Sequence, residues 1–427
     1  MKKIAIIGAG VMGLSAAYHL LKKDYDVDIY EAAKEPGGMA AHFDFDGLSI
    51  ERFYHFICKT DFDTFELLDE LNIKDELIWK ETSMGYFMNE KINKWGDPIS
   101  LLKFPKISMT IKLRYGLLAF LSTKIKKWDS LENLSAEKWL KKWVGAKGYD
   151  ILWKKLMELK FHEYSGDISA KWLWTRIRRT GASRKSIFQE ELGYINGGSE
   201  TLVYALVNQI ESMGGNIYYS APPKKIISKS GKVSGLEVSN KKIKYDNIIS
   251  TIPTPYIESF ADCLNSQEKK AYKSIKNIGV VCVLFKLSKK ISNHFWLNIS
   301  DDSIEIPGII EFSNLRNLEN NIIYVPYYMP ITNSKFKNSD AEFINESLKY
   351  IKKINPQISD NDVLSAYVGR LKHAQPICDL GFEKKLPSIE TSVKGLFIAD
   401  TCFYYPEDRG ISESVKMGKK LSELALK

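Results

Sequence analysis

The chain has 427 residues, of which 44% are hydrophobic and 26% are charged, and its formal net charge is +9. This composition can supply the cores of two domains, and it argues against a disordered chain. No apolar segment reaches the roughly 18 residues that cross a bilayer, and no nucleic-acid-binding motif accompanies the positive charge. Five widely spaced cysteines without a C-x-x-C pair argue against structural zinc. We therefore expect a cytoplasmic protein without a metal site or a nucleic-acid partner.

The first 31 residues have the order strand, tight turn, helix, strand. Three glycines form the motif G-x-G-x-x-G in the turn: Gly8, Gly10 and Gly13. The first glycine permits the turn, the second lets the backbone approach a pyrophosphate, and the third lets the helix pack on the strand. Glu31 follows Gly8 by 23 positions, where a carboxylate accepts hydrogen bonds from a ribose. The segment predicts a dinucleotide site, and the carboxylate disfavours NADP.

The next few residues resemble the flavoprotein extension of this motif, in which a Gly-Gly pair lies against the pyrophosphate of FAD. Lys34 falls where that family usually has arginine, Gly37-Gly38 forms the pair, and Met39 replaces a frequent basic residue. The resemblance implies FAD as the cofactor. We expect this half of the site to consist of Gly8, Gly10, Val11, Met12, Gly13, Glu31, Ala32, Lys34, Gly38 and Met39.

Residues 46–71 resemble the corresponding segment of UDP-galactopyranose mutases and protoporphyrinogen oxidase-like proteins. In those families a histidine-containing loop passes beside the flavin ring, and His55 matches that histidine. The mutases have a further histidine where this chain has Cys58-Lys59. The resemblance implies a catalytic position for His55, whereas a histidine that only completes a core is the alternative.

Residues 97–190 have helical spacing and two basic segments. Residues 102–128 alternate apolar and basic side chains, so this segment could lie on an anionic membrane surface or line a tunnel for a lipid chain. A core helix with a solvated basic face is the alternative. Residues 171–185 place four arginines beside two tryptophans, a combination that suits phosphate or carboxylate groups. From this cluster we expect Arg176 and Arg184 to contact the substrate, unless the cluster is only a solvated face.

Residues 191–255 resemble the middle FAD segment of the amine oxidase, protoporphyrinogen oxidase and phytoene desaturase superfamily. Gly197-Gly198 opens a helix with an apolar residue at every fourth position, and strands are expected over 217–219, 233–238 and 243–249. Residues 256–374 alternate in strand fashion and predict an antiparallel sheet beside the flavin.

The C-terminal segment GLFIAD (395–400) resembles the superfamily's last FAD strand. Asp400 matches the acid that contacts the cofactor, although Ala399 replaces the family's glycine. Gly410 opens a helix whose N-terminal amides would point at the flavin, so Asp400, Gly410 and Ile411 are expected to bind FAD. Cys402 matches no covalent-linkage motif, which indicates non-covalent FAD.

The charged turn before this helix, residues 405–409, is expected to face the flavin and the substrate. In that position Arg409 and Tyr405 are candidate catalytic residues. A salt-bridged cap of Arg409 with Glu407 or Asp408 is the alternative.

These segments predict an α/β chain. A Rossmann-like FAD-binding domain of the GR2 flavoprotein type would comprise 1–96, 191–255 and 375–427, and an α+β substrate-binding domain with an antiparallel sheet would comprise 97–190 and 256–374.

The resemblance implies an FAD-dependent oxidoreductase of the amine oxidase and protoporphyrinogen oxidase-like group. Such an enzyme would oxidise a C–H or C–N bond of a small, lipid-linked or sugar-linked substrate by hydride transfer to flavin. The alternatives are a redox-neutral sugar mutase, a polyprenoid desaturase and a flavin-binding protein without catalysis. The oligomeric state stays open, as does contact with the inner face of the membrane.

Overall fold

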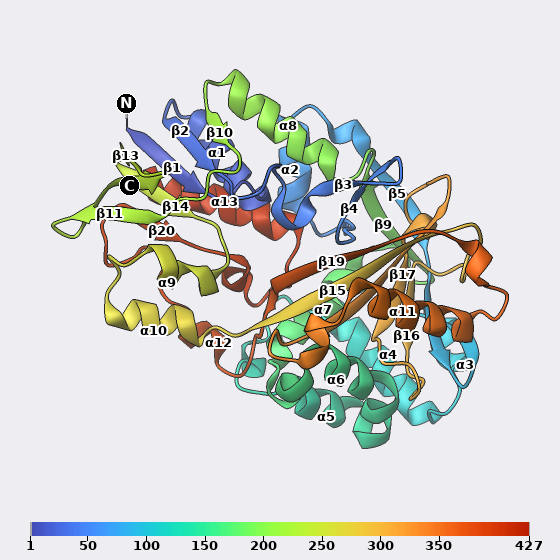
Figure 1. Ribbon diagram of the computed structural model, residues 1–427. Coiled ribbons are helices and arrows are strands. Elements are labelled where there is room, and N and C mark those ends of the chain that lie inside the picture. Colours follow the sequence, from blue (N-terminus) through green and yellow to red (C-terminus); the bar gives the residue numbers. More distant parts are fainter. Residues whose placement is uncertain (1, 427) are drawn as a thin grey trace.

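Five parallel strands form the central sheet of the first domain. Their order is β10-β2-β1-β14-β20, and every neighbouring pair is parallel. The computed structural model describes residues 2–426, and it brings three distant segments of the chain together in this sheet (Figure 1). The strands are β1 (Lys3–Ile7), β2 (Asp26–Tyr30), β10 (Asn216–Tyr218), β14 (Asn247–Ser250) and β20 (Leu396–Ile398).

Helices cover one face of the parallel sheet. They are α1 (Val11–Leu21), α2 (Phe62–Glu70), α8 (Ser199–Ser212) and α13 (Ile411–Leu426). α1 packs against α8 and α13, and α2 packs against α13 (Figure 1). Gly418 allows the close contact of α1 with α13, because a Cβ atom there would lie 2.5 Å from the carbonyl oxygen of Met12.

A small antiparallel sheet covers the other face. It consists of β11 (Lys225–Lys229), β12 (Lys232–Val238) and β13 (Lys241–Lys244), with α9 (Ile257–Phe260) and α10 (Ser266–Ser274) beside it. The strand that we expected over 243–249 is divided between β13 and β14. The division is explained by Tyr245, whose hydroxyl donates to Asp28 at 2.6 Å, and by Asp246, which accepts the N–H of Lys3 at 2.8 Å. These contacts turn the chain between the two strands.

Seven strands form the sheet of the second domain, in the order β19-β15-β18-β17-β16-β6-β7. All neighbours are antiparallel except β16 and β6. The strands are β6 (Met84–Met88), β7 (Lys91–Trp95), β15 (Asn277–Leu287), β16 (Trp296–Ile299), β17 (Gly308–Glu311), β18 (Asn321–Met329) and β19 (Val363–Pro376). α11 (Asp340–Ile354) packs on one face through Phe343 and Ile351.

The composition of this sheet changes one expected domain boundary. β6 and β7 lie within 1–96, which we assigned to the FAD-binding domain, yet β6 pairs with β16 from Trp296↔Met84 to Ile299↔Phe87. The first segment of the FAD-binding domain therefore ends before Met84. The pairing joins residues more than two hundred positions apart, so local sequence carries no sign of it.

A helical layer packs beneath the seven-stranded sheet, as we expected for residues 97–190 (Figure 1). It contains α3 (Pro98–Lys103), α4 (Met109–Lys124), α5 (Ala136–Tyr149), α6 (Lys155–Phe161) and α7 (Ala170–Ala182). Serine side chains cap the N-termini of α4, α5 and α7 by accepting backbone N–H groups: Ser108, Ser135 and Ser169.

Short elements complete the described chain. The strand pair β3 (His42–Phe45) and β4 (Leu48–Glu51) follows the second glycine loop, and β5 (Leu77–Thr82) pairs with β9 (Gln189–Ile195), which also pairs with β8 (Arg184–Ser186). α12 (Phe382–Lys385) precedes β20. Within residues 2–426, no helix has both the length and the apolar character that crossing a membrane requires.

Candidate cofactor site and active site

One continuous pocket lies between the two domains. Its walls come from the glycine loops after β1 and β2, from the loop around His55, and from the turn before α13. The second domain contributes residues of α6, α7, β15, β18 and β19. The pocket therefore joins the predicted dinucleotide site to a wall that belongs to the predicted substrate domain.

The dinucleotide end of the pocket is a contact between two glycine loops. The backbone N–H of Gly37 donates to the carbonyl of Ala9 at 2.8 Å, and a Cβ atom on Gly38 would lie 3.2 Å from the Cα atom of Gly10. Side chains at these positions would fill the space over the first turn of α1. This backbone cradle at a helix N-terminus fits the diphosphate of FAD, since free N–H groups and the helix dipole favour an anion.

Glu31 lies at the end of β2, in the pocket. One carboxylate oxygen accepts the N–H of Ala9 at 2.7 Å, and the other accepts the N–H of Ala33 at 2.8 Å. These bonds hold the carboxylate beside the glycine motif, where a ribose hydroxyl group can donate to it. The ribose contact of Glu31 stays a prediction.

The remaining residues predicted for the dinucleotide half of the site fall into two groups, inside and outside the pocket lining. Val11, Met12 and Met39 line the pocket, whereas Ala32 and Lys34 are exposed and lie outside its lining. Gly13 is buried against the preceding turn, where a Cβ atom would overlap the carbonyl oxygen of Gly8. The structure thus supports a packing role for Gly13, and the predicted cofactor contacts of Ala32 and Lys34 stay predictions.

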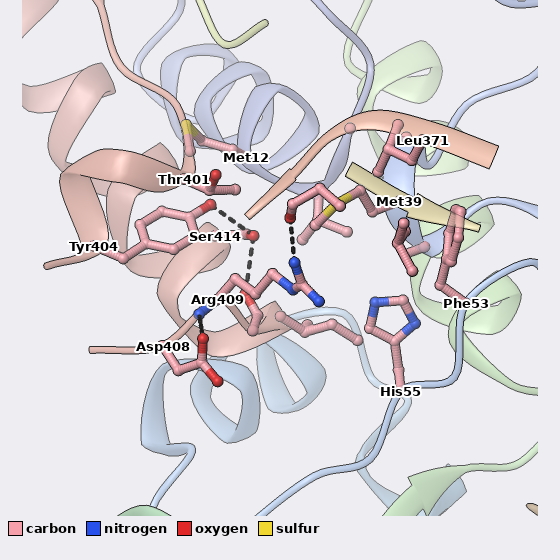
Figure 2. Close-up of a pocket in the computed structure, with 18 of the residues that line it drawn as sticks. Met12, Met39, Phe53, His55, Leu371, Thr401, Tyr404, Asp408, Arg409 and Ser414 are labelled. Atoms are coloured by element: carbon pink, nitrogen blue, oxygen red, sulfur yellow. Dashed lines mark hydrogen bonds between the residues drawn. The ribbon is translucent and has the colours of Figure 1, made fainter. Parts of the chain in front are cut away.

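The C-terminal end of the site is built around Asp400 and the start of α13. Both oxygens of the buried Asp400 carboxylate accept backbone N–H groups, from Cys402 at 2.8 Å and from Thr254 at 2.6 Å. Tyr404 and Ser414 share a hydrogen bond of 2.8 Å, and Ser414 also donates to the carbonyl of Gly410 (Figure 2). These bonds hold the first turn of α13 at the pocket.

The acids of the charged turn are paired with arginines of α7. Asp408 accepts from Arg176 at 2.6 Å, and Glu407 accepts from Arg178 at 2.6 Å. The expected alternative, a salt-bridged cap formed by Arg409 itself, is therefore not the arrangement observed. The guanidinium of Arg409 instead donates to the carbonyl of Ala374, and its side chain reaches into the pocket toward His55 (Figure 2).

His55 and Arg409 line the pocket together. The Nδ1 atom of His55 is buried and has no hydrogen-bond partner within residues 2–426. Burial lowers the pKa of His55 to about 4, so its imidazole is neutral near pH 7. A neutral imidazole can either accept or donate a proton toward a molecule in the pocket.

Lys160 is a site residue that the sequence did not reveal. Its side chain is buried, and its ammonium lies 5.3 Å from the ring centroids of both Trp172 and Tyr328. Burial, together with the charges of Arg176 and Arg409, holds the pKa of Lys160 well below its usual value. No local signal marked it, because it is one of the 61 lysines and arginines of the chain and lies in a segment with ordinary helical spacing.

Tyr405 and Arg184, which we predicted to contact the substrate or take part in catalysis, also lie outside the pocket lining. The hydroxyl of Tyr405 bonds to Ser169 at 2.9 Å and to Glu132 at 3.0 Å, inside the second domain. Arg184 donates to the backbone carbonyls of Gly96 and Ile187. The catalytic role of Tyr405 and the substrate role of Arg184 are corrected accordingly, because their polar groups already bond elsewhere.

Comparison with known proteins supplies a family for this geometry. The sequence matches the family described as flavin containing amine oxidoreductase over residues 12–376. The 15-cis-phytoene desaturase of Synechococcus elongatus is 24% identical over 283 residues, which cover 59% of this chain and 58% of that protein. The chain thus spans less than two thirds of the length of the first curated relatives that it matches.

Solved structures share the fold over the whole chain. The putative protoporphyrinogen oxidase from Exiguobacterium sp. has a TM-score of 0.77 at 15% identity, with 100% of this chain and 99% of that chain covered. Reduced UDP-galactopyranose mutase has a TM-score of 0.76 at 16% identity, with 100% and 96% covered. These likenesses show that the chain shares the fold of both proteins.

Proposed function

We propose that this chain, which belongs to the flavin containing amine oxidoreductase family, oxidises a C–H or C–N bond of a substrate held against the second domain. It is a flavin-dependent oxidoreductase with FAD as its cofactor. Bound FAD supplies the acceptor for a hydride. The observation that supports the proposal is the continuity of the pocket from the Gly10–Gly38 contact to Lys160. A molecule at the second-domain wall would share one space with the cofactor.

The residues around this space have different roles in the proposed reaction. Aromatic and apolar side chains from both domains limit the access of water: Phe53, Tyr54, Phe56, Trp296, Tyr328 and Leu371. His55 is neutral and can hold or move a proton at Nδ1. Arg409 and the N-terminus of α13 place fixed positive charge in the pocket, which favours negative charge that develops during reaction.

The test is reduction of the purified holoenzyme under anaerobic conditions. The flavin should first be released into the supernatant by acid precipitation, because we propose that it is not covalently bound. Candidate substrates from the classes of amines, polyprenoids and sugar nucleotides are then mixed with the enzyme, and bleaching of the flavin absorbance is followed. One class should bleach it in a single turnover. Failure of every class to do so, in fully loaded enzyme, would oppose the oxidoreductase proposal.

A redox-neutral sugar mutase is a second candidate. The positive wall formed by Lys160, Arg176 and Arg409 favours it, because a nucleotide-linked sugar carries a diphosphate. Once the enzyme has been reduced, a mutase would convert its substrate to an isomer without net re-oxidation of the flavin. Product analysis with reduced enzyme distinguishes it from the first candidate.

A further inference from the structure

Three cationic side chains meet in the pocket, two from the second domain and one from the turn before α13. Lys160 comes from α6, Arg176 from α7 and Arg409 from the turn before α13. Two aromatic rings lie between them. The ammonium of Lys160 and the guanidinium of Arg409 both lie over Tyr328, at 5.3 and 5.9 Å from its centroid. Lys160 and Arg176 both lie over Trp172, at 5.3 and 6.0 Å. The rings thus hold the three cations in one group, which we call the cationic wall.

The cationic wall contains more positive charge than its neighbours neutralise. Asp408 accepts from Arg176 at 2.6 Å, from the backbone N–H of Arg409 at 3.0 Å and from Gln375 at 3.1 Å. These donors occupy both of its carboxylate oxygens. Lys160 has no ion-pair or hydrogen-bond partner within the described chain, although only 6% of its surface is exposed.

Burial and the two neighbouring arginines hold the pKa of Lys160 well below its usual value while no acceptor faces it, and an anionic ligand would supply the acceptor that favours the charged ammonium. We propose that the cationic wall binds an anionic group of the substrate, a carboxylate or a phosphate, through Lys160 and Arg409. This inference rests on the proposed function, since it assigns the charge of the substrate that the same site would oxidise. Arg176 is held by Asp408 and positions that carboxylate, while Lys160 and Arg409 are free to contact the ligand.

The assignment narrows the substrate classes left open above. A protonated amine would be repelled by the guanidinium groups of Arg176 and Arg409, and an uncharged polyprenoid would leave Lys160 without an acceptor. Aromatic rings beside the cations are compatible with a ligand that carries an apolar or ring portion next to its anionic group. The cationic wall therefore favours an acidic small molecule or a phosphate-linked substrate.

Anion binding can be measured without turnover. Holoenzyme is titrated with pyrophosphate, with succinate and with putrescine, while the flavin absorbance spectrum and the melting temperature are recorded. We expect a saturable change with an anion and none with the diamine. Pyrophosphate acting alone would identify a phosphate site, and succinate acting alone would identify a carboxylate site. The absence of a saturable response to either anion would overturn the inference.

Variants connect the response to the cationic wall. Lys160→Met should weaken anion binding by at least about tenfold, because a charge-assisted contact is lost. Lys154→Met is the matched control, because Lys154 is about half exposed and pairs only with Glu158 at 4.0 Å. Arg409→Gln gives a second reading if Lys160→Met folds poorly. If Lys160→Met or Arg409→Gln binds the anion as tightly as the wild type does, the assignment is contradicted.

The flavin content separates this inference from the proposed function. Enzyme that binds FAD and is reduced by a substrate, yet binds no anion at the cationic wall, would refute only the anionic substrate. Enzyme that binds the anion but is never reduced would refute only the oxidoreductase proposal.

A second inference is carried independently by the outer surface of α3 and α4. α4 exposes four large apolar side chains along one face, at spacings of four, four and three residues: Met109, Leu113, Leu117 and Phe120, with 55%, 63%, 50% and 58% of their surface exposed. Ile99 and Leu102 of the adjoining α3 are 51% and 48% exposed. Leu118, on another side of α4, is buried in the second-domain core. α4 is therefore apolar toward solvent as well as toward the core, which a soluble surface helix usually avoids.

The segment that carries this apolar face is basic. Residues 98–128 contain no aspartate or glutamate. They contain six lysines and one arginine: Lys103, Lys106, Lys112, Arg114, Lys124, Lys126 and Lys127. A second copy docked on this face would bring two basic segments together, which like-charge repulsion opposes. Anionic lipid headgroups complement the charge while the apolar side chains enter the acyl boundary. We infer that this face docks on the surface of an anionic bilayer.

The test is co-sedimentation with vesicles. The holoenzyme should sediment with phosphatidylcholine vesicles that contain phosphatidylglycerol, and salt should weaken this binding. Leu113→Glu with Leu117→Glu should abolish it, whereas Leu364→Glu should not, because Leu364 is 49% exposed on β19. No sedimentation with anionic vesicles would overturn the inference. A dimer seen by light scattering, and lost in the double variant without any vesicle binding, would assign the face to a second copy instead.

Discussion

Arg176 on α7 and Asp408 in the turn before α13 form an ion pair of 2.6 Å across the junction of the two domains. Two neighbouring pairs repeat the arrangement, Arg178 with Glu407 and Arg179 with Asp61, each at 2.6 Å. The basic cluster of α7 therefore joins the domains through these ion pairs. Through Asp408 the junction also fixes the backbone of Arg409, whose N–H donates to that carboxylate at 3.0 Å and whose side chain lines the pocket.

The first prediction concerns the cofactor contact of Glu31. Glu31→Arg should yield largely apoprotein, because the variant removes the acceptor of a ribose hydroxyl and breaks the bonds to Ala9 and Ala33. The measurement is the ratio of flavin to protein absorbance after purification. Glu35→Arg is the control, since Glu35 is exposed in the same loop and lies outside the pocket. Full flavin content in Glu31→Arg would show that the ribose site lies elsewhere.

The second prediction concerns the stability of the domain junction. Asp61 accepts from Arg179 at 2.9 and 2.6 Å, and the side chains are 4% and 13% exposed. Asp61→Ala should lower the free energy of unfolding by about 3 kcal/mol, because it leaves a buried guanidinium unpaired. Glu407→Gln should cost less than about 1 kcal/mol, since its pair with Arg178 is about 30% exposed and screened by water.

Urea unfolding of both variants measures this difference. Equal stability losses in Asp61→Ala and Glu407→Gln would show that burial does not set the strength of these pairs.

Motifs whose residues are close in sequence were predictable. The turn at Gly8 and the carboxylate of Glu31 follow from spacing within the first 31 residues, the start of α13 at Gly410 was expected from the resemblance of the C-terminal segment, and all three lie at one pocket. Strand–turn–helix units are local, so the sequence carries their geometry.

Contacts between distant segments were not predictable. Lys160 meets Arg409 only because α6 and the C-terminal turn lie against the same ring of Tyr328. Tyr405 and Arg184 were misassigned, because proximity in sequence to a site residue does not determine the direction of a side chain. The pairing of β6 with β16 displaced a domain boundary for a related reason, since strand partners are chosen by tertiary packing.

The third prediction concerns pH and Glu413 in the first turn of α13. Burial raises the pKa of Glu413 to about 7, above its ordinary value of 4.5. The folded protein therefore binds a proton at Glu413 more tightly than the unfolded chain does. The stability that this proton contributes is complete below pH 4.5 and is lost as the pH rises toward 7.

Glu413→Gln should remove this dependence. Its free energy of unfolding relative to the wild type should increase steadily between pH 4.5 and 7 and level off above that range, as followed by urea unfolding at a series of pH values. A difference between the two proteins that does not change with pH would show that Glu413 titrates normally in the folded state.

The last prediction separates catalysis from structure at Arg409. Its guanidinium lines the pocket and donates to the carbonyl of Ala374, whereas the acids beside it are paired with arginines of α7. Arg409→Ala should therefore leave FAD occupancy and melting temperature nearly unchanged. The rate of flavin reduction by substrate should fall roughly a hundredfold, because a preorganised charge is worth about 3 kcal/mol to a transition state. Arg178→Ala is the control, since Arg178 pairs with Glu407 and lies outside the pocket lining. It should keep its reduction rate per bound flavin and lose some stability. If Arg409→Ala loses flavin while retaining turnover per flavin, Arg409 is structural, and its place in the cationic wall must be reassigned.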